Sequence, residues 1–296
     1  MLLRFYNALA RRKFLNWLSD KTFIKIQYKL CTKKRLNLSS PKTFNEKIQW
    51  LKLYGNLQKY TNLVDKYEVR KYISETIGEE YLIPLLGVWE RFEDIDFEKL
   101  PEQFVLKCNH DCGSVVICKD KTTFDIKAAQ SKLNKYLKRN FYYENKEPQY
   151  KNIKPRIICE KYMVDESWAE LKDYKIFCFD GEPKIIQVNY DRVIDHKLNF
   201  YDTKWNYISI RLMPHHTDPN KIIGKPNNLD EMLNLAKIFS KKHLFIRVDF
   251  YSIRDRIYFG ELTFSPNAGF KEFKPEEFNV EMGSYIELPK GIQNDF

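Results

Sequence analysis

The sequence contains no long apolar run, and this excludes one large class of protein. No segment reaches the ~18 consecutive apolar residues that a membrane-spanning helix needs. The N-terminal stretch MLLRFYNALARRKF is interrupted by Arg4, Arg11 and Arg12, which argues against a signal peptide. Most of the six cysteines lie in apolar, strand-like runs, where free cysteine behaves as a small hydrophobic residue. We therefore expect reduced thiols and a cytoplasmic location.

The signatures of several enzyme and binding classes are also missing. There is no GxSxG motif, no Ser/His/Asp arrangement and no glycine pattern of the Rossmann or Walker type. No zinc-finger, RRM or KH pattern, internal repeat or Gly/Ser-rich linker is present. Cys108, His110 and Cys112 offer only three zinc ligands within five residues, so a zinc site is disfavoured. His196 and the pair at 215–216 have no visible partner, and we expect them to be structural.

Composition and element order indicate a soluble α+β protein with room for about two domains. The 296 residues are 43% hydrophobic and 30% charged. Capping residues and apolar spacing predict helices over 39–54, 63–77, 125–140 and 228–241, the third of them opening with a Thr122-x-x-Asp125 capping box. Apolar runs predict strands over 81–88, 103–108, 114–119 and 156–163, and hairpins over 175–190 and 245–263. The first hairpin is expected to turn at Asp180–Gly181.

The net charge of +10 is concentrated at the N-terminus. Residues 1–35 carry ten lysines and arginines against one acid, Asp20, and large apolar side chains are interleaved with them. A basic amphipathic segment of this kind can lie on an anionic membrane surface or bind a nucleic-acid backbone. It can equally pack on its own domain with a basic outer face. Because no nucleic-acid-binding motif accompanies it, we expect no nucleic-acid partner and keep the other two interpretations open.

Two acids in the second hairpin raise the question of what neutralises them. Placing Ile253 opposite Ile257, around a turn at 254–256, sets Asp249 opposite Glu261. Opposed like charges destabilise a strand pair, so folding alone gives no reason for them. A hard cation such as Mg²⁺, which binds one or two carboxylates, would turn the repulsion into coordination. The alternative is a solvated hairpin face on which Arg247 neutralises Asp249.

Three further stretches carry residues suited to nucleotide binding, although none is specific by itself. Lys107 ends a predicted strand before a loop that closes with Gly113–Ser114, and such a loop can bring backbone N–H groups close to phosphate. Ordinary hairpin loops share this pattern. Glu160–Lys161 ends another strand, either to face an adenine edge or as a charged strand terminus. Lys66 falls in the first turn of the helix predicted over 63–77, where a solvated lysine is the plainer interpretation.

In their order along the chain, these residues resemble the ATP-grasp superfamily. A wider similarity to the TupA-like branch of this superfamily runs from about residue 20 to about residue 288. It is carried by the segments SPKTFNEKIQWLKLY, GEEYLIPLLGVW, FVLKCNHDCGS, KDYKIFCFDGEPK and RVDFY…IYFGELTFSP. The resemblance implies an α+β ATP-grasp fold, with two α+β subdomains clasping ATP and an N-terminal helical extension. It implies a basic helical region at 1–60, a pre-ATP-grasp region at 61–102, a lid subdomain at 103–165 and a C-terminal subdomain with the Mg²⁺ site at 166–296.

The resemblance also implies ATP and Mg²⁺ as cofactors and a role for each candidate residue. The residues expected to contact ATP are Lys66, Lys107, Gly113, Ser114, Glu160, Lys161, Tyr162 and Met163. The lysines and the glycine loop would face the phosphates, and 160–163 the adenine. Asp249 and Glu261 would hold Mg²⁺, while Arg247 and Lys175 would be catalytic, contacting the transferred phosphoryl group or the substrate.

One position departs from the pattern of many ATP-grasp enzymes. Those enzymes have Glu-x-Asn where this chain has Glu261-x-Thr263. Threonine is a poorer metal ligand than asparagine, so a second Mg²⁺ would rely on water or on Asn267. The residues that bind the acceptor substrate cannot be carried over from the resemblance.

The implied activity is an ATP-dependent carboxylate–amine ligase. ATP would phosphorylate a carboxylate, and an amine would attack the acyl phosphate to give an amide, ADP and phosphate. The TupA-like branch is associated with teichuronopeptide and capsule-type polysaccharides, so the expected partners are a polysaccharide or lipid-linked sugar acceptor and an amino acid or other amine. The basic N-terminal segment would hold the enzyme at the inner face of the cytoplasmic membrane. The alternatives are a sugar kinase with the same ATP site, a glycosyltransferase using a nucleotide sugar, and a non-catalytic adaptor.

Overall fold

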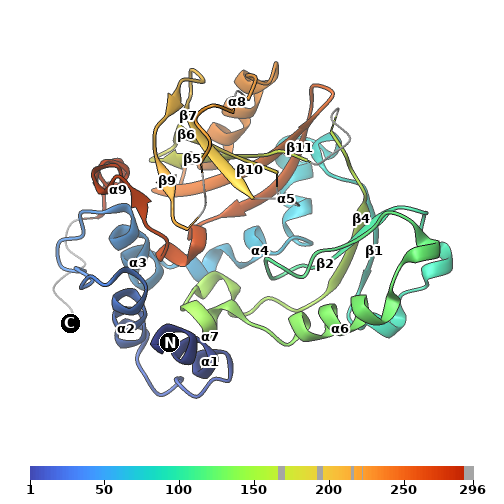
Figure 1. Cartoon of the computed structure of the whole chain (residues 1–296), viewed down its shortest axis with the longest axis horizontal. Coiled ribbons are helices and arrows are strands. Elements are labelled where there is room, and N and C mark those ends of the chain that lie inside the picture. The colour runs from blue at the N-terminus through green and yellow to red at the C-terminus, as the bar shows by residue number, and fades with distance from the viewer. Residues whose placement is uncertain (166–170, 192–195, 215–216, 222, 290–296) are drawn as a thin grey trace.

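Two antiparallel sheets form the framework of this computed structural model, which describes residues 1–165, 171–191, 196–214, 217–221 and 223–289. The larger sheet has the strand order β11-β10-β5-β6-β7-β8, and the smaller has the order β1-β4-β2-β3. In Figure 1 the two sheets lie side by side, and several helices are gathered near the N-terminus. Positions 215–216, expected to be structural histidines, fall outside the described residues.

Eight of the twelve strands among the described residues follow the predicted runs, whereas those at 197–202, 207–208, 211–212 and 273–274 were not predicted. Those of the smaller sheet are β1 (Leu85–Trp89), β2 (Phe104–Cys108), β3 (Val116–Cys118) and β4 (Ile157–Lys161). Those of the larger sheet are β5 (Asp173–Phe179), β6 (Glu182–Tyr190), β7 (Lys197–Asp202), β8 (Tyr207–Ile208), β10 (Phe245–Ile253) and β11 (Arg256–Thr263). A separate pair is formed by β9 (Arg211–Leu212) and β12 (Phe273–Lys274). The turn between β5 and β6 lies at Asp180–Gly181, as predicted, with positive φ angles of 46° and 83°.

The helices differ from the sequence-based expectation at one important place. They are α1 (Leu2–Arg11), α2 (Asp20–Thr32), α3 (Phe44–Tyr54), α4 (Thr61–Val64), α5 (Val69–Thr76), α6 (Ile126–Leu137), α7 (Phe141–Asn145), α8 (Leu229–Ser240) and α9 (Glu276–Ser284). The single helix predicted over 63–77 was wrong, because α4 and α5 are separated by a turn that contains Lys66. The capping box was also misplaced, since Asp125 itself caps α6 by accepting a hydrogen bond from the backbone N–H of Ala128.

The two faces of the larger sheet are covered differently, and this leaves room for a site. One face packs against α4, α5 and α8 in a cluster that includes Ile176, Val188 and Val248. On the other face, Phe177, Phe179 and Phe245 pack around α3 and α9. Further along β5 and β10 that second face becomes polar. The aromatic cluster therefore anchors the half of the sheet next to the polar residues.

The smaller sheet has one covered face and one face toward the larger sheet. Leu106, Cys108 and Cys159 belong to a buried cluster with Ala129 and Leu133 of α6, which lies along this sheet in Figure 1. Because side chains alternate along a strand, Lys107 and Glu160 take the opposite face. The charged residues of this sheet are thus turned away from its core.

The second hairpin has the predicted opposition of Asp249 and Glu261 but reaches it by a different route. Ile253 pairs with Arg256, so the expected pairing of Ile253 with Ile257 was wrong. The turn has only two residues, 254 and 255, both with positive φ as a type I′ turn requires. Gly260 is the extra residue of a β-bulge between the pairs Phe250–Phe259 and Asp249–Glu261, and it moves the register by one.

Helix α3 begins with a capping box. The Thr43 hydroxyl accepts a hydrogen bond from the Glu46 N–H, and the Glu46 carboxylate accepts one from the Thr43 N–H at 3.0 Å. We expect Thr43→Ala to lower the free energy of unfolding by ~1 kcal/mol, because it leaves a helix N–H without its partner. Chemical denaturation monitored by circular dichroism measures this. Thr76→Ala, at the exposed end of α5, is the matched control, and an equal loss there would contradict the capping argument.

Candidate active site

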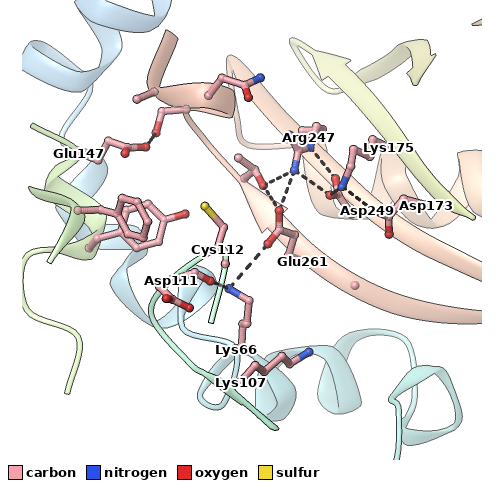
Figure 2. Close-up of a pocket in the computed structure, with 18 of the residues that line it drawn as sticks. Lys66, Lys107, Asp111, Cys112, Glu147, Asp173, Lys175, Arg247, Asp249 and Glu261 are labelled. Carbon is pink, nitrogen blue, oxygen red and sulfur yellow. Dashed lines mark hydrogen bonds and ion pairs between the residues drawn. The ribbon is translucent and has the colours of Figure 1, made fainter. Parts of the chain in front are cut away.

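A cavity of about 570 Å³ lies where the polar face of the larger sheet meets the β2–β3 loop of the smaller one. Eight of the twelve predicted site residues line it. They are Lys66, Lys107, Gly113, Ser114, Lys175, Arg247, Asp249 and Glu261. Figure 2 shows the two lysines at 66 and 107 on one side of this cavity and the charged residues of β5, β10 and β11 on the other. Residues from distant parts of the sequence therefore share one pocket.

The strand register places a row of charges across the larger sheet. Asp249 on β10 is directly opposite Glu261 on β11 and Lys175 on β5. The Asp249 carboxylate forms an ion pair with Lys175 and accepts two hydrogen bonds from the Arg247 guanidinium, at 2.6 and 2.7 Å. Arg247 also donates to Glu261 Oε1 at 2.7 Å and to Thr263 Oγ1 at 3.1 Å.

This row is buried, so the solvated face considered from the sequence was wrong. The exposed fraction is 2% for Asp249 and 8% for Arg247. Burying a charge is costly unless opposite charges and hydrogen bonds accompany it, and here one arginine spans both acids. Glu261 is the most open member of the row, with a third of its side chain exposed to the cavity. It is therefore the acid best placed to meet a ligand.

The surroundings of Glu261 favour its ionised form. Burial opposes ionisation, but the positive charges of Lys66, Arg247 and Lys175 outweigh it and lower the pKa of Glu261 to about 2. The Lys66 ammonium lies 3.9 Å from Glu261 Oε2 and donates a hydrogen bond to the Asp111 carbonyl at 2.5 Å. Lys66 thus connects the larger sheet to the β2–β3 loop, and it is not the solvated lysine of the plainer interpretation.

The turn that carries Lys66 is attached to the start of the β2–β3 loop. The Asp65 carboxylate accepts a hydrogen bond from the Tyr67 N–H at 2.8 Å and from the Asn109 side-chain amide at 2.9 Å. The Lys66 N–H donates to the Asn109 carbonyl at 3.0 Å. Asp65 and Asn109 are both buried, so these bonds fix the position of the lysine.

The β2–β3 loop holds its own shape. The Ser114 hydroxyl donates to Asp111 Oδ1 at 2.5 Å and accepts from the Cys108 N–H at 2.7 Å. Gly113 has a φ of 133°, and a Cβ atom there would also lie 3.2 Å from the Tyr136 hydroxyl. Ser114 is fully buried, so its hydroxyl shapes the loop, while its phosphate-binding role stays a prediction.

The end of β4 lies next to the cavity but does not line it. Glu160 is buried and pairs with Lys107 at 2.5 Å and with Arg70 at 3.6 Å. Lys161 is exposed at the end of the strand, and its N–H donates to the Pro84 carbonyl at 3.0 Å. Tyr162 and Met163 follow β4 and are partly buried. The adenine role expected for 160–163 stays a prediction.

Sequence patterns missed several residues of the pocket. These are Asp111, Asn145, Glu147, Tyr150, Asp173, Ser265 and Lys271. Asp173 was detectable, because it lies two residues before Lys175 on the same strand face and pairs with it at 3.3 Å. Glu147 and Tyr150 belong to a segment with no motif of its own. The two cysteines considered as zinc ligands do not lie together, because the Cys108 thiol is buried against α6 while Cys112 faces the cavity. No cluster of three or more metal-binding side chains occurs among the described residues.

A left-handed turn closes the pocket beyond β11. Asn267, Ala268 and Gly269, in the 3-10 turn Pro266–Gly269, all have positive φ angles, between 50° and 70°. The Ala268 carbonyl accepts hydrogen bonds from the Gln49 amide at 2.9 Å and the Lys52 ammonium at 3.1 Å. Such a backbone is strained for residues other than glycine, and helix α3 supplies the contacts that hold it.

The residues of the row suit a hard cation. Asp249 and Glu261 offer only oxygen atoms, and two protein carboxylates are what Mg²⁺ usually takes when phosphates complete its shell. The Glu261 Oε2 atom makes a long contact with Lys66, so it can accept a further partner. Thr263 is already engaged, donating to Glu261 Oε1 at 3.1 Å.

A family model, TupA-like ATPgrasp, matches residues 46–287 and so covers both sheets and every residue that lines this pocket. The chain belongs to the TupA-like ATP-grasp family. Membership confirms the resemblance to this family and the expected α+β ATP-grasp fold. No curated protein matches the sequence.

Solved structures of ATP-grasp proteins are among the distant similarities of this chain. The D-alanine–D-alanine ligase of Bacillus anthracis complexed with ATP is 19% identical, with 72% of this chain and 59% of that chain covered and a TM-score of 0.40. The corresponding ligase of Helicobacter pylori is 16% identical, with 82% and 69% covered and a TM-score of 0.38. A RimK-domain ATP-grasp protein of Sphaerobacter thermophilus is 10% identical, with 78% and 69% covered and a TM-score of 0.42. The family assignment depends on the family match alone.

The lowered pKa of Glu261 predicts a pH dependence of stability. A carboxyl whose pKa falls from 4.5 to about 2 on folding contributes stability above pH 4.5 and loses it as the pH falls toward 2. We expect the free energy of unfolding of Glu261→Gln to depend less steeply on pH over this range than that of the wild type. Urea titrations at several pH values measure both slopes. Glu281→Gln, at an exposed position of α9, is the control, and equal slopes for wild type and Glu261→Gln would contradict the network.

Proposed function

We propose that this protein is an ATP-dependent carboxylate–amine ligase in surface polysaccharide assembly. It joins an amino acid or similar amine to a uronic acid, or an amino acid to an amino sugar. One observation carries the ligase proposal: in a chain of the ATP-grasp family, two acids flanked by Arg247 and Lys175 face Lys66 and Lys107 across a single cavity. The polysaccharide setting is supported by the association of the TupA-like branch with such polymers.

The reaction has two steps. A carboxylate oxygen of the first substrate attacks the γ-phosphorus of ATP, and ADP leaves with the electron pair of the broken P–O bond. The amine of the second substrate then attacks the carbonyl carbon of the acyl phosphate. The C–N bond forms as the C–O bond to phosphate breaks, and phosphate leaves with that electron pair while the nitrogen loses one proton to it. The products are an amide, ADP and phosphate.

The side chains of the cavity supply positioning and charge for the first step. Lys66 and Lys107 would bind ATP phosphates from the smaller sheet, while Arg247 and Lys175 would neutralise charge on the transferred phosphoryl group from the larger one. Asp249 and Glu261 would hold Mg²⁺, which supplies electrostatic stabilisation of the phosphate oxygens when bound. Cations on both sides of one cavity can align a phosphate chain between a nucleotide and an acceptor.

The nucleotide site predicts a ligand-dependent stability. Because a ligand that binds only the folded state raises the unfolding midpoint, ATP with Mg²⁺ is expected to stabilise the wild type by several degrees. Glu261→Ala should lose most of the Mg²⁺-dependent part of this shift. Thermal unfolding with ATP, ADP, UTP and UDP-sugars, each with and without Mg²⁺, measures this, with Glu281→Ala as the control. Stabilisation by a UDP-sugar alone would refute the ligase proposal and favour a glycosyltransferase.

We also propose that the N-terminal segment contacts the cytoplasmic membrane surface, where lipid-linked acceptors occur. Tyr6 and Ala10 of α1 are buried against the protein, whereas Phe5, Phe14 and Trp17 are each more than 60% exposed. Exposed basic residues are interleaved with these apolar side chains in the sequence, namely Arg4, Arg11, Arg12 and Lys13. Exposed aromatic and cationic side chains in one segment suit the interface of an anionic bilayer. None of the described helices is long and apolar enough to cross a membrane.

The membrane proposal predicts binding to anionic vesicles. The triple variant Phe5→Ser, Phe14→Ser and Trp17→Ser is expected to sediment with phosphatidylglycerol vesicles at least about tenfold less than the wild type, because it removes apolar surface that lipid would bury. The control is Ile238→Ser with Val280→Ser, which changes side chains that are 43% and 44% exposed elsewhere. Equal sedimentation of the wild type and the triple variant, or no binding by the wild type, would count against membrane contact.

A further inference from the structure

A buried carboxylate lies at the opposite end of the pocket from the charge row. Glu147 directly precedes the 3-10 turn Pro148–Tyr150 and is only 5% exposed, yet it lines the cavity. Figure 2 shows it on the far side of Cys112 from Glu261. The pocket therefore has an acidic group at each end.

The hydrogen bonds of Glu147 come from neutral donors. The Ser265 hydroxyl donates to Oε1 at 2.6 Å, and the Asn145 side-chain amide donates to Oε2 at 3.2 Å. An ionised carboxylate can accept about four hydrogen bonds through its two oxygen atoms. Glu147 thus keeps acceptor capacity for a further partner.

Two lysines close to Glu147, Lys52 in the fold and Lys146 in the sequence, form hydrogen bonds or ion pairs with other groups. Lys52 is the positive charge that acts on Glu147 most strongly, yet its ammonium donates a hydrogen bond to Gln49 Oε1 at 2.8 Å. Lys146, the preceding residue, forms its ion pair with Asp20 at 3.1 Å. The further partner that Glu147 can accept is therefore best supplied by a cationic ligand in the cavity.

Burial gives Glu147 and Lys52 unusual proton affinities. Burial raises the pKa of Glu147, although Lys52 acts against the shift. Burial also lowers the pKa of Lys52. A carboxylate with a raised pKa accepts a proton from an amine more readily than an ordinary surface acid does.

A basic residue and a neutral hydroxyl also line this pocket. The basic residue is Lys271, which lines the same cavity as Glu147. Burial, reinforced by the charges of Glu147 and Glu261, keeps the pKa of Tyr150 well above its usual value, so its hydroxyl stays protonated. A carboxylate, an ammonium and a hydroxyl within one enclosed space suit a ligand that carries both an amine and an acid group.

We propose that this end of the pocket is the subsite for the amine substrate and that this substrate is a free amino acid. Glu147 binds its ammonium group and Lys271 binds its carboxylate. The proposal rests on the ligase function proposed above and adds the class of the amine. It also assigns Glu147 a catalytic role, because the amine must lose a proton before it can attack.

The ammonium group of the amine substrate loses two protons as the amide forms. The ammonium nitrogen gives one proton to the Glu147 carboxylate, and its lone pair forms the C–N bond to the acyl carbon. The C–O bond to phosphate breaks, and phosphate leaves with that electron pair. The second proton lost by the nitrogen goes to the departing phosphate. Neutral hydroxylamine needs no such deprotonation and so does not depend on Glu147.

Amino-acid binding tests the proposal directly. The probes are the twenty common amino acids, their N-acetyl derivatives and glucosamine, observed by saturation-transfer NMR with and without Mg²⁺ and a non-hydrolysable ATP analogue. We expect at least one amino acid to bind the wild type. Glu147→Gln and Lys271→Met should each weaken this binding at least about tenfold, because each removes a charge-assisted hydrogen bond. The matching N-acetyl derivative should not bind.

The controls separate this proposal from the proposed function. Glu277→Gln, an exposed acid on α9, should bind like the wild type. Circular dichroism and binding of the ATP analogue show whether each variant is folded, and Lys271→Met provides a second test if Glu147→Gln is not. Binding of glucosamine but of no amino acid, or full binding by both folded variants, would overturn the amino-acid subsite. A wild type that binds amino acids but no ATP analogue would instead contradict the ligase.

Discussion

The pairing of Arg247 with two buried acids is the constraint on which the candidate site depends. Its guanidinium reaches Asp249 on its own strand and Glu261 on the next one, so it offsets a repulsion that the strand register creates. Lys175 balances the row from the other side. Buried charges of this kind add little net stability, because their desolvation offsets their attraction. Their arrangement therefore makes more sense as preparation for a charged ligand than as a device for folding.

The rest of the fold holds this row in place through apolar packing. On the same face of the sheet, Phe177 and Phe245 pack against Phe44 of α3, one or two side chains away from the polar residues. The next turn of helix α3 contacts a different part of the pocket. Gln49 and Lys52 reach across to the strained turn at 267–269 and occupy its carbonyls. One helix thus supports both the strands that carry the charges and the loop that closes the pocket.

Local features of the site could be predicted from the sequence, whereas long-range ones could not. The opposition of Asp249 and Glu261 was predicted from strand periodicity, but with a turn that was one residue too long. The bulge at Gly260 shifts the register by one residue and so restores the predicted pairing. Periodicity alone cannot locate a two-residue turn or a bulge. The position of Lys66 was missed because α4 and α5 keep a helical spacing across their break. Glu147 has no local signature, because its partner Ser265 lies 118 residues away.

The N-terminal helices link the membrane surface proposed here to the amine end of the pocket. Arg11 of α1 donates to Glu144 at 2.9 Å, and Gln27 of α2 donates to the Glu144 carbonyl at 3.1 Å. Lys146 pairs with Asp20 at 3.1 Å. These contacts lie in and just after α7, directly before Glu147, and α1 and α7 are neighbours in Figure 1. A lipid surface that holds α1 would therefore lie on the side of the molecule where the segment bearing Glu147 is attached.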